Sequence, residues 1–130
     1  MNVHQSLDTD LDELLGKCLT VFEELSGIGI RICYKTLPKG TLGQTRVKKD
    51  VAYKSKGKKT ILWRPVIEVS SDIKKLSDAT ERHRLTTYVI VHELVHISRE
   101  HLSRPKGRVE HEPDFNSEVQ ERIHRLEDSW

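Results

Sequence analysis

The segment that most constrains the fold of this chain is an apolar helix that carries three ionisable side chains. Residues 79–102 repeat apolar residues at helical spacing, and the stretch "YVIVHELVHI" within them is apolar on several faces. Such a helix has to be buried on most of its sides, so the rest of the chain must pack around it. Ionisable groups in a buried helix cost free energy unless they have partners, and a metal ion is one such partner.

Two histidines and a glutamate form the pattern H-E-x-x-H on this helix. His92 and His96 are four residues apart and lie on one face, one turn apart, so both imidazoles can reach a single zinc ion. Glu93 points about 100° away from His92, beside the metal rather than onto it. A carboxylate there can take a proton from zinc-bound water without being a ligand. The pattern predicts a zinc site with Glu93 as general base.

A catalytic zinc site usually has three protein ligands and one open position, so a third ligand is needed. His101 follows His96 by five residues, which turns it away from the metal-facing side if the helix continues. His111 lies beyond Pro105 and Gly107, near the end of the loop "SRPKGRVEHE", and just before Pro113, where a last helix is expected to begin, so the chain can fold back and present it. Glu118 is the alternative, early in that helix. The sequence favours His111 and leaves Glu118 open.

The chain before the central helix is predicted to form one helix and three strands. Apolar residues at steps of three and four predict a helix over residues 7–26, which Gly27 and Gly29 are expected to end. Alternating apolar residues then predict strands at about 30–34, 44–53 and 60–69, the last two joined by the turn "KSKGKK". Proline removes a backbone donor, so Pro65 predicts that the third strand lies at a sheet edge or is bulged.

The order of elements predicts an α+β fold in a single domain, residues 1–130. Asp78 is expected to cap the central helix, and the apolar stripe that starts at Phe115 predicts a C-terminal helix. The predicted architecture is therefore an N-terminal helix, a small three-stranded and mainly antiparallel sheet, the helix with the H-E-x-x-H motif and a C-terminal helix.

The composition and the N-terminal sequence also predict where the protein is located and whether its cysteines are reduced. The 130 residues are 35% hydrophobic with a net charge of +2, which suits one soluble domain with an aliphatic core. "MNVHQSLDTDLDELL" has no basic region followed by an apolar stretch, so no signal peptide is predicted, and no apolar run reaches transmembrane length. The cytoplasm is the expected location, with Cys18 and Cys33 as reduced, buried thiols.

Two short motifs resemble the SprT-like and WLM-type zinc metalloproteases. "VHELVHI" followed by a loop and "HEPDF" is similar to the pattern of those families: H-E-x-x-H, a variable loop, then H-x-x-x-F or H-x-x-x-W opening the closing helix. The upstream "LGQTRV" and "PVIEVSSDI" resemble the strands before the active-site helix, so the likeness covers roughly residues 40–125. It implies a minimal zincin-like core in which His92, His96 and His111 bind zinc and Glu93 is the general base.

The predicted function is hydrolysis of peptide bonds. Zinc would polarise the amide carbonyl, while Glu93 activates a zinc-bound water and then passes its proton to the leaving amine. An extended peptide could bind by strand addition to the predicted strand at 44–53 or to the strand that contains Pro65. Candidates for stabilising the transition state are Arg108, Tyr88 and His101, each of which also has a structural interpretation.

A basic cluster raises the question of a DNA partner. The cluster comprises Arg46, Lys48, Lys49, Lys54, Lys56, Lys58 and Lys59. A lysine-rich hairpin is usually a solvated face that protects a sheet edge, but it can also form an electrostatic contact with nucleic acid. The SprT-like and WLM families include proteases that act on proteins attached to DNA, so the resemblance implies possible DNA association through the Arg46–Lys59 hairpin.

Two other functions stay open. A zinc-dependent nuclease family has a similar H-x-x-x-H helix, but its third histidine would fall at Leu102, and it lacks the glutamate after the first histidine. A non-catalytic module that binds DNA or protein and uses zinc only to hold its fold would normally have four protein ligands, often cysteines. Cys18 and Cys33 lie in the predicted first helix and first strand, with no evident relation to the motif.

Overall fold

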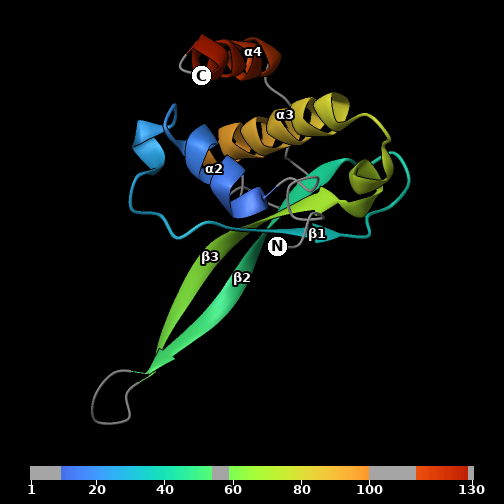
Figure 1. The fold of residues 1–130 in the computed structure, drawn as a ribbon. Helices are drawn as coiled ribbons and strands as arrows, with labels where there is room; N and C mark the ends of the chain where they lie inside the picture. The colour runs from blue at the N-terminus through green and yellow to red at the C-terminus, as the bar shows by residue number, and fades with distance from the viewer. Residues whose placement is uncertain (1–9, 54–58, 100–113, 129–130) are drawn as a thin grey trace, which may run out of the picture.

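The computed structural model describes residues 10–53, 59–99 and 114–128, and the side chains of residues 49–63 are not part of that description. Three α-helices, three strands and two short 3-10 helices form the described chain (Figure 1), which confirms the predicted α+β class. In chain order they are α2 (Leu11–Leu19), η1 (Glu23–Leu25), β1 (Arg31–Lys35), β2 (Gly43–Tyr53), β3 (Lys59–Ser70), η3 (Ser71–Lys75), α3 (Ala79–Ser98) and α4 (Phe115–Asp128).

The three strands form one mixed sheet in the order β1-β3-β2. β2 and β3 pair antiparallel along their whole length, from Gly43 opposite Val69 to Tyr53 opposite Lys59. β1 pairs parallel with β3 over a shorter stretch, starting with Arg31 opposite Val66. The predicted sheet, small and mainly antiparallel, is thereby confirmed. The far half of the β2–β3 hairpin extends beyond the helices (Figure 1).

Pro65 was predicted to put its strand at a sheet edge. That prediction is wrong for the part of β3 that begins at Val66. β3 lies between the other two strands, and β1 pairs with it only from Val66 to Ser70. Pro65 directly precedes that stretch and has Val47 of β2 as its single described strand partner. The missing backbone donor of proline is therefore placed where β3 has a neighbour on one side only. Among the described strands, β2 is an edge strand beside the motif helix.

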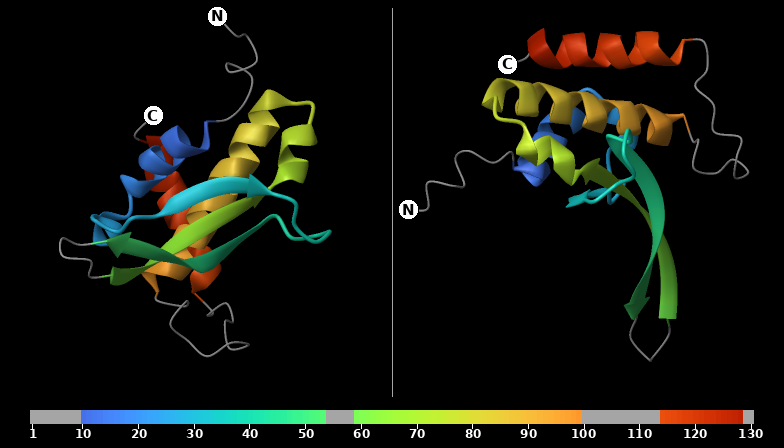
Figure 2. Two further views of the ribbon diagram at one scale, coloured as in Figure 1. Left: turned by 90° about the horizontal axis from the view of Figure 1, so that it is seen from below. Right: turned by 90° about the vertical axis from the view of Figure 1, so that its right-hand side faces the viewer.

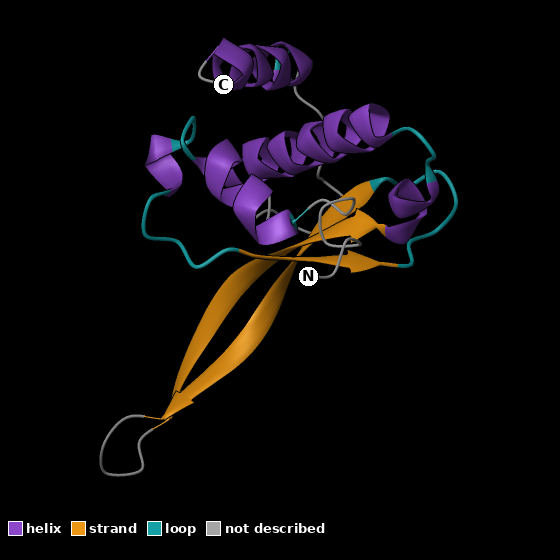
Figure 3. Ribbon diagram, in the orientation of Figure 1, coloured by secondary structure: helices purple, strands orange, loops and turns teal. Residues whose placement is uncertain are grey.

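All three α-helices lie on one side of the sheet (Figures 2 and 3). α3 lies against the sheet, and α4 packs on the other side of α3, so α3 forms a middle layer. This arrangement confirms the prediction of a helix that is buried on most sides. The α3 residues with buried hydrophobic side chains are Val89, Ile90, Val91, Leu94, Val95 and Ile97. Ile67 and Val69 of β3 belong to the same core, so the side of the sheet that carries their side chains is the side that faces the helices.

The predicted start of α3 is confirmed, but the helix ends earlier than predicted. Asp78 is the N-cap, and its Oδ1 accepts hydrogen bonds from the backbone N–H of Thr80 at 2.8 Å and of Glu81 at 3.4 Å. The helix ends at Ser98 with Arg99 as its C-cap, earlier than the predicted end at about residue 102.

The first helix is shorter than the predicted 7–26, because α2 ends at Leu19. The Thr20 hydroxyl donates to the Lys17 carbonyl at 2.6 Å, and such local side-chain bonds compete with helix continuation. Phe22 and Leu25 are nevertheless buried at 1% and 4% exposure, so the apolar stripe enters the core through a turn and η1. Of the two thiols, Cys18 is buried as predicted, but Cys33 on β1 is exposed, so the prediction for Cys33 is wrong.

Candidate metal centre

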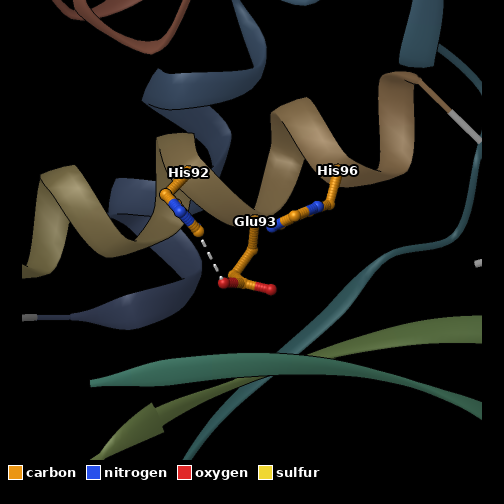
Figure 4. Close-up of side chains that lie close together, drawn as sticks. All are labelled: His92, Glu93 and His96. Atoms are coloured by element: carbon orange, nitrogen blue, oxygen red, sulfur yellow. Dashed lines mark hydrogen bonds and ion pairs between the residues drawn. The ribbon is translucent and has the colours of Figure 1, made fainter. Parts of the chain in front are cut away.

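Three side chains of the H-E-x-x-H motif converge beneath α3 (Figure 4). His92, Glu93 and His96 each offer a ligand atom, and these atoms lie within 4.8 Å of one another. Glu93 and His96 are buried at 6% and 8% exposure, and His92 is partly buried. Two imidazoles and one carboxylate so close together form a group that could hold a metal ion, as the spacing of the motif predicts.

The carboxylate of Glu93 is held at both of its oxygens. The Thr45 hydroxyl donates to Oε1 at 2.7 Å, and Oε2 lies 3.1 Å from Nδ1 of His92 (Figure 4). Because a carboxylate only accepts hydrogen bonds, Nδ1 carries the hydrogen in this contact. The lone pair of His92 is then on Nε2, so Nε2 is the nitrogen that would bind a metal ion.

Thr45 was not predicted as a site residue. It lies on β2, 48 residues before Glu93, and within the sheet it pairs with Ile67, whose side chain belongs to the core beneath the helices. The only sequence signal is its position in the alternating pattern of the strand. That pattern places Thr45 on a face but does not reveal which helix residue lies opposite.

A glycine permits this contact between β2 and α3. A Cβ atom built on Gly43 would lie 2.3 Å from Cγ1 of Val89, far inside van der Waals contact. Two strand residues advance about 6.6 Å and four helix residues about 6 Å, so the steps from Gly43 to Thr45 and from Val89 to Glu93 match. The close approach at Gly43 therefore brings the Thr45 hydroxyl to the carboxylate of Glu93.

The imidazoles pack on an aromatic ring from α4. Phe115 is fully buried, and its ring centroid lies 4.5 Å from that of His96 and 5.1 Å from that of His92. The two imidazoles are 4.9 Å apart, centroid to centroid. Phe115 thus restricts the orientation of both rings from the side of α4, while Thr45 holds Glu93 from the side of β2.

Ion pairs fix the start of α4 against the end of α3. The Arg99 guanidinium contacts Asp114 at 2.9 Å and Glu118 at 2.5 Å, and Arg122 contacts the other oxygen of Glu118 at 3.2 Å. The hydrogen bond from Arg99 lowers the pKa of Asp114, and the bonds to Asp114 and Glu118 raise the pKa of Arg99. Both carboxylate oxygens of Glu118 are engaged by arginines, and Glu118 is not part of the metal group.

The remaining candidates from the sequence have mixed outcomes. His111, His101 and Arg108 lie outside the described residues, so their positions are not part of this description. Tyr88 lies one turn before His92 on α3, and the two ring centroids are 5.8 Å apart. It is therefore a neighbour of the metal group.

A cavity of about 320 Å³ opens beside the group. The connection before β2 lines it on one side, and Tyr88, Val89, His92 and Glu93 of α3 line it on the other. The site therefore combines a possible metal donor set, a buried carboxylate and an adjacent space for a ligand.

The donor set suits a divalent transition metal but does not select one. Imidazole nitrogen binds zinc, copper, iron and nickel, and a neighbouring carboxylate is compatible with each of them. His92 and His96, with Glu93 beside them, therefore fit zinc without excluding the other ions.

Comparisons with known proteins found nothing similar: no family model matches the sequence, and no match was found among curated proteins or solved structures. Within the described residues, no helix combines the length and apolar character that a membrane span requires. The functional assignment therefore rests on the residues of the site.

Proposed function

We propose that this protein is a zinc-dependent metallopeptidase of the H-E-x-x-H type, as its resemblance to the SprT-like and WLM-type proteases implies. The observation that carries the proposal is the convergence of two imidazoles and a buried carboxylate within 4.8 Å on one helix. The carboxylate is also held in place by Thr45 from the edge strand β2. A histidine pair that served only to pack the core would need neither the glutamate nor its threonine partner.

The chain's own residues supply the proton chemistry. When bound by His92 and His96, zinc supplies a Lewis acid that polarises a substrate carbonyl and acidifies water. Glu93 is the general base: it accepts a proton from the attacking water and returns it to the leaving amine. Hydrogen bonds from Thr45 to Oε1 and from His92 to Oε2 hold the carboxylate in one orientation for this proton transfer.

His111 is the proposed third ligand, and two contacts support it over Glu118. Phe115, four residues after His111, touches both imidazole rings, and four residues of extended chain span at most about 14 Å. The chain length between Phe115 and His111 is therefore compatible with His111 as a ligand of the metal group. Glu118, in contrast, would have to give up ion pairs with Arg99 and Arg122 in order to bind the metal.

The proposed substrate is an extended peptide that pairs with the outer edge of β2. Within the described sheet, β2 pairs only with β3, and Thr45 links this strand directly to the general base. A peptide added as a further strand would run past the metal group with its amide carbonyls in regular register.

The test compares metal content and hydrolysis in matched variants. Glu93→Gln should bind zinc like the wild type but lose hydrolysis of a casein-like substrate, and Glu81→Gln, an exposed position on the same helix, should retain both. His111→Ala should lose zinc, whereas Glu118→Ala should keep it. If the protein hydrolyses RNA and not casein, it is a zinc-dependent nuclease and the proposed peptidase function is wrong. If it binds zinc but hydrolyses neither substrate, it is a non-catalytic module in which zinc holds the fold.

A second candidate function, binding of DNA, is favoured by the charge on the sheet face away from the helices. The register places five basic residues there, namely Arg31, Lys35, Arg46, Lys48 and Arg64. The acidic residue among them, Glu68, is 2% exposed and pairs with Arg46 at 2.9 Å and Lys35 at 3.3 Å. Burial alone would raise the pKa of Glu68, but hydrogen bonds from Gln44, Arg46 and Lys35 lower it below its ordinary value.

Salt dependence tests this second function. If duplex DNA binds the basic face, affinity should fall steeply with salt, and Arg31→Gln with Lys48→Gln should weaken binding and reduce the slope by about 2. Lys17→Gln on α2, an exposed lysine on the helical side, is the matched control. Binding that is absent at low salt, or insensitive to salt, would rule the function out.

A further inference from the structure

One wall of the cavity beside the metal group is made by the connection that precedes β2. Residues 40–43 form this wall. A turn opens it, in which the N–H of Thr41 donates to the Pro38 carbonyl at 2.9 Å and Gly40 takes a φ of +90°. The Leu42 carbonyl accepts from the N–H of Ser70 at 2.8 Å, which ties the wall to β3. The cavity is therefore built into the fold.

The opposite wall belongs to the same helix turns that carry the motif. Tyr88 and Val89 line the cavity one turn before His92 and Glu93, which also line it. Glu93 is the one carboxylate among the lining residues, and no lysine or arginine lines the cavity. Leu42 is 41% exposed, and it contributes to the cavity wall.

The size and chemistry of this cavity identify what it can receive. Its volume of about 320 Å³ is at the lower end of ligand sites, which typically measure about 300–1,000 Å³, so it suits one side chain rather than a whole peptide. A peptide paired with β2 presents every second side chain on the same face, about 6.6 Å apart, so only one of them can enter.

We infer that this cavity is the specificity pocket of the enzyme and accepts an uncharged, apolar side chain next to the bond that is cleaved. This inference rests on the proposed peptidase function. An acidic side chain in the pocket would face the carboxylate of Glu93 with no lysine or arginine among the lining residues, and it would compete with the substrate carbonyl for the metal held by His92 and His96. A basic side chain would pair with Glu93 and so occupy the general base. Leu42, Tyr88 and Val89 provide apolar contacts for an aliphatic or aromatic side chain.

A charge placed at Leu42 tests the assignment. The zinc-loaded full chain is given peptides that differ only at the residues flanking the cleaved bond (Leu, Phe, Glu or Lys), and kcat/KM and the cleavage position are measured for each. The wild type should prefer Leu and Phe over Glu by tenfold or more. Leu42→Lys should shift the ratio of Leu to Glu substrates toward Glu by roughly fivefold to twentyfold, since it adds an opposite charge and removes apolar contact.

Two further variants separate the pocket from general effects of a surface charge. Leu42→Glu should move the preference the other way, toward Lys. Leu76→Lys makes the same chemical change at a leucine that is 38% exposed and lies outside the cavity, so it should leave the ratio unchanged. If both Leu42 variants hydrolyse peptides with the wild-type ratio of Leu to Glu substrates, the assignment of the cavity as the specificity pocket is wrong, and the proposed peptidase function is unaffected. If zinc-loaded wild type cleaves no peptide, the peptidase and its pocket are both overturned.

Discussion

Replacing Thr45 by valine should slow catalysis while leaving metal binding intact. Valine has nearly the volume of threonine and the same branching at Cβ, so β2 should keep its conformation. The variant removes the hydroxyl that donates to Oε1 of Glu93 at 2.7 Å. It therefore isolates one hydrogen bond between the edge strand and the proposed general base.

The magnitude follows from the burial of the acceptor. Glu93 is 6% exposed, and hydrogen bonds to charged groups contribute about 1.5–3 kcal/mol. If the bond is needed to hold Glu93 in its reactive position, kcat should fall by roughly tenfold to a hundredfold, because each 1.36 kcal/mol corresponds to a factor of ten. The metal-free protein should also lose about 1–3 kcal/mol of stability, which lowers Tm by roughly 3–5 °C per kcal/mol for a domain of this size.

The assay measures zinc content, Tm, kcat and KM for the wild type, Thr45→Val and Thr45→Ser. Serine keeps the donor, so most of kcat should return in Thr45→Ser, and KM should change little in either variant. A kcat within twofold of the wild type in Thr45→Val would show that this bond does not position the base. An equal fall in both variants would assign the effect to packing of β2 rather than to the hydroxyl.

Three further predictions concern stability and reactivity. Cys33 should react at once with a thiol reagent in the native protein, whereas Cys18 should react only on unfolding, because burial raises its pKa to about 12. Stability should fall as the pH drops from about 4.5 through the lowered pKa of Glu68, since protonation then costs the ionised contacts of the folded state, and Glu68→Gln should flatten that acid limb in thermal scans. Arg99→Met should cost about 1–3 kcal/mol in urea unfolding, because it leaves the partly buried Glu118 with Arg122 alone, and an unchanged midpoint would contradict the role of this ion pair.

The parts of the site that could be predicted are those set by local geometry. His92, Glu93 and His96 lie within five consecutive residues of one helix, so the helical repeat alone places them together. The cap at Asp78 is equally local. The bond from Thr45 spans 48 residues and depends on how closely β2 approaches α3, which no pattern in either segment specifies.

The errors have a common physical origin in tertiary packing. An apolar stripe does not distinguish one long helix from a short helix followed by a buried turn, because Phe22 and Leu25 are buried in either case. Strand order does not follow chain order here: β3 lies between β1 and β2, so Pro65 is in the central strand. Likewise, the alternation in β1 shows that Cys33 faces away from Ile32 and Tyr34 but not which face is covered.

The dependence on distant segments also limits what the motif can do alone. α3 sets the spacing of His92 and His96, but Phe115 of α4 restricts their ring orientations and Thr45 of β2 fixes the carboxylate between them. Both supports approach the same two turns of the helix from opposite layers of the fold. An isolated α3 peptide should therefore bind metal weakly, since each side chain would have to lose its rotamer freedom on binding. Preorganisation by β2 and α4 is what turns a five-residue pattern into a candidate catalytic centre.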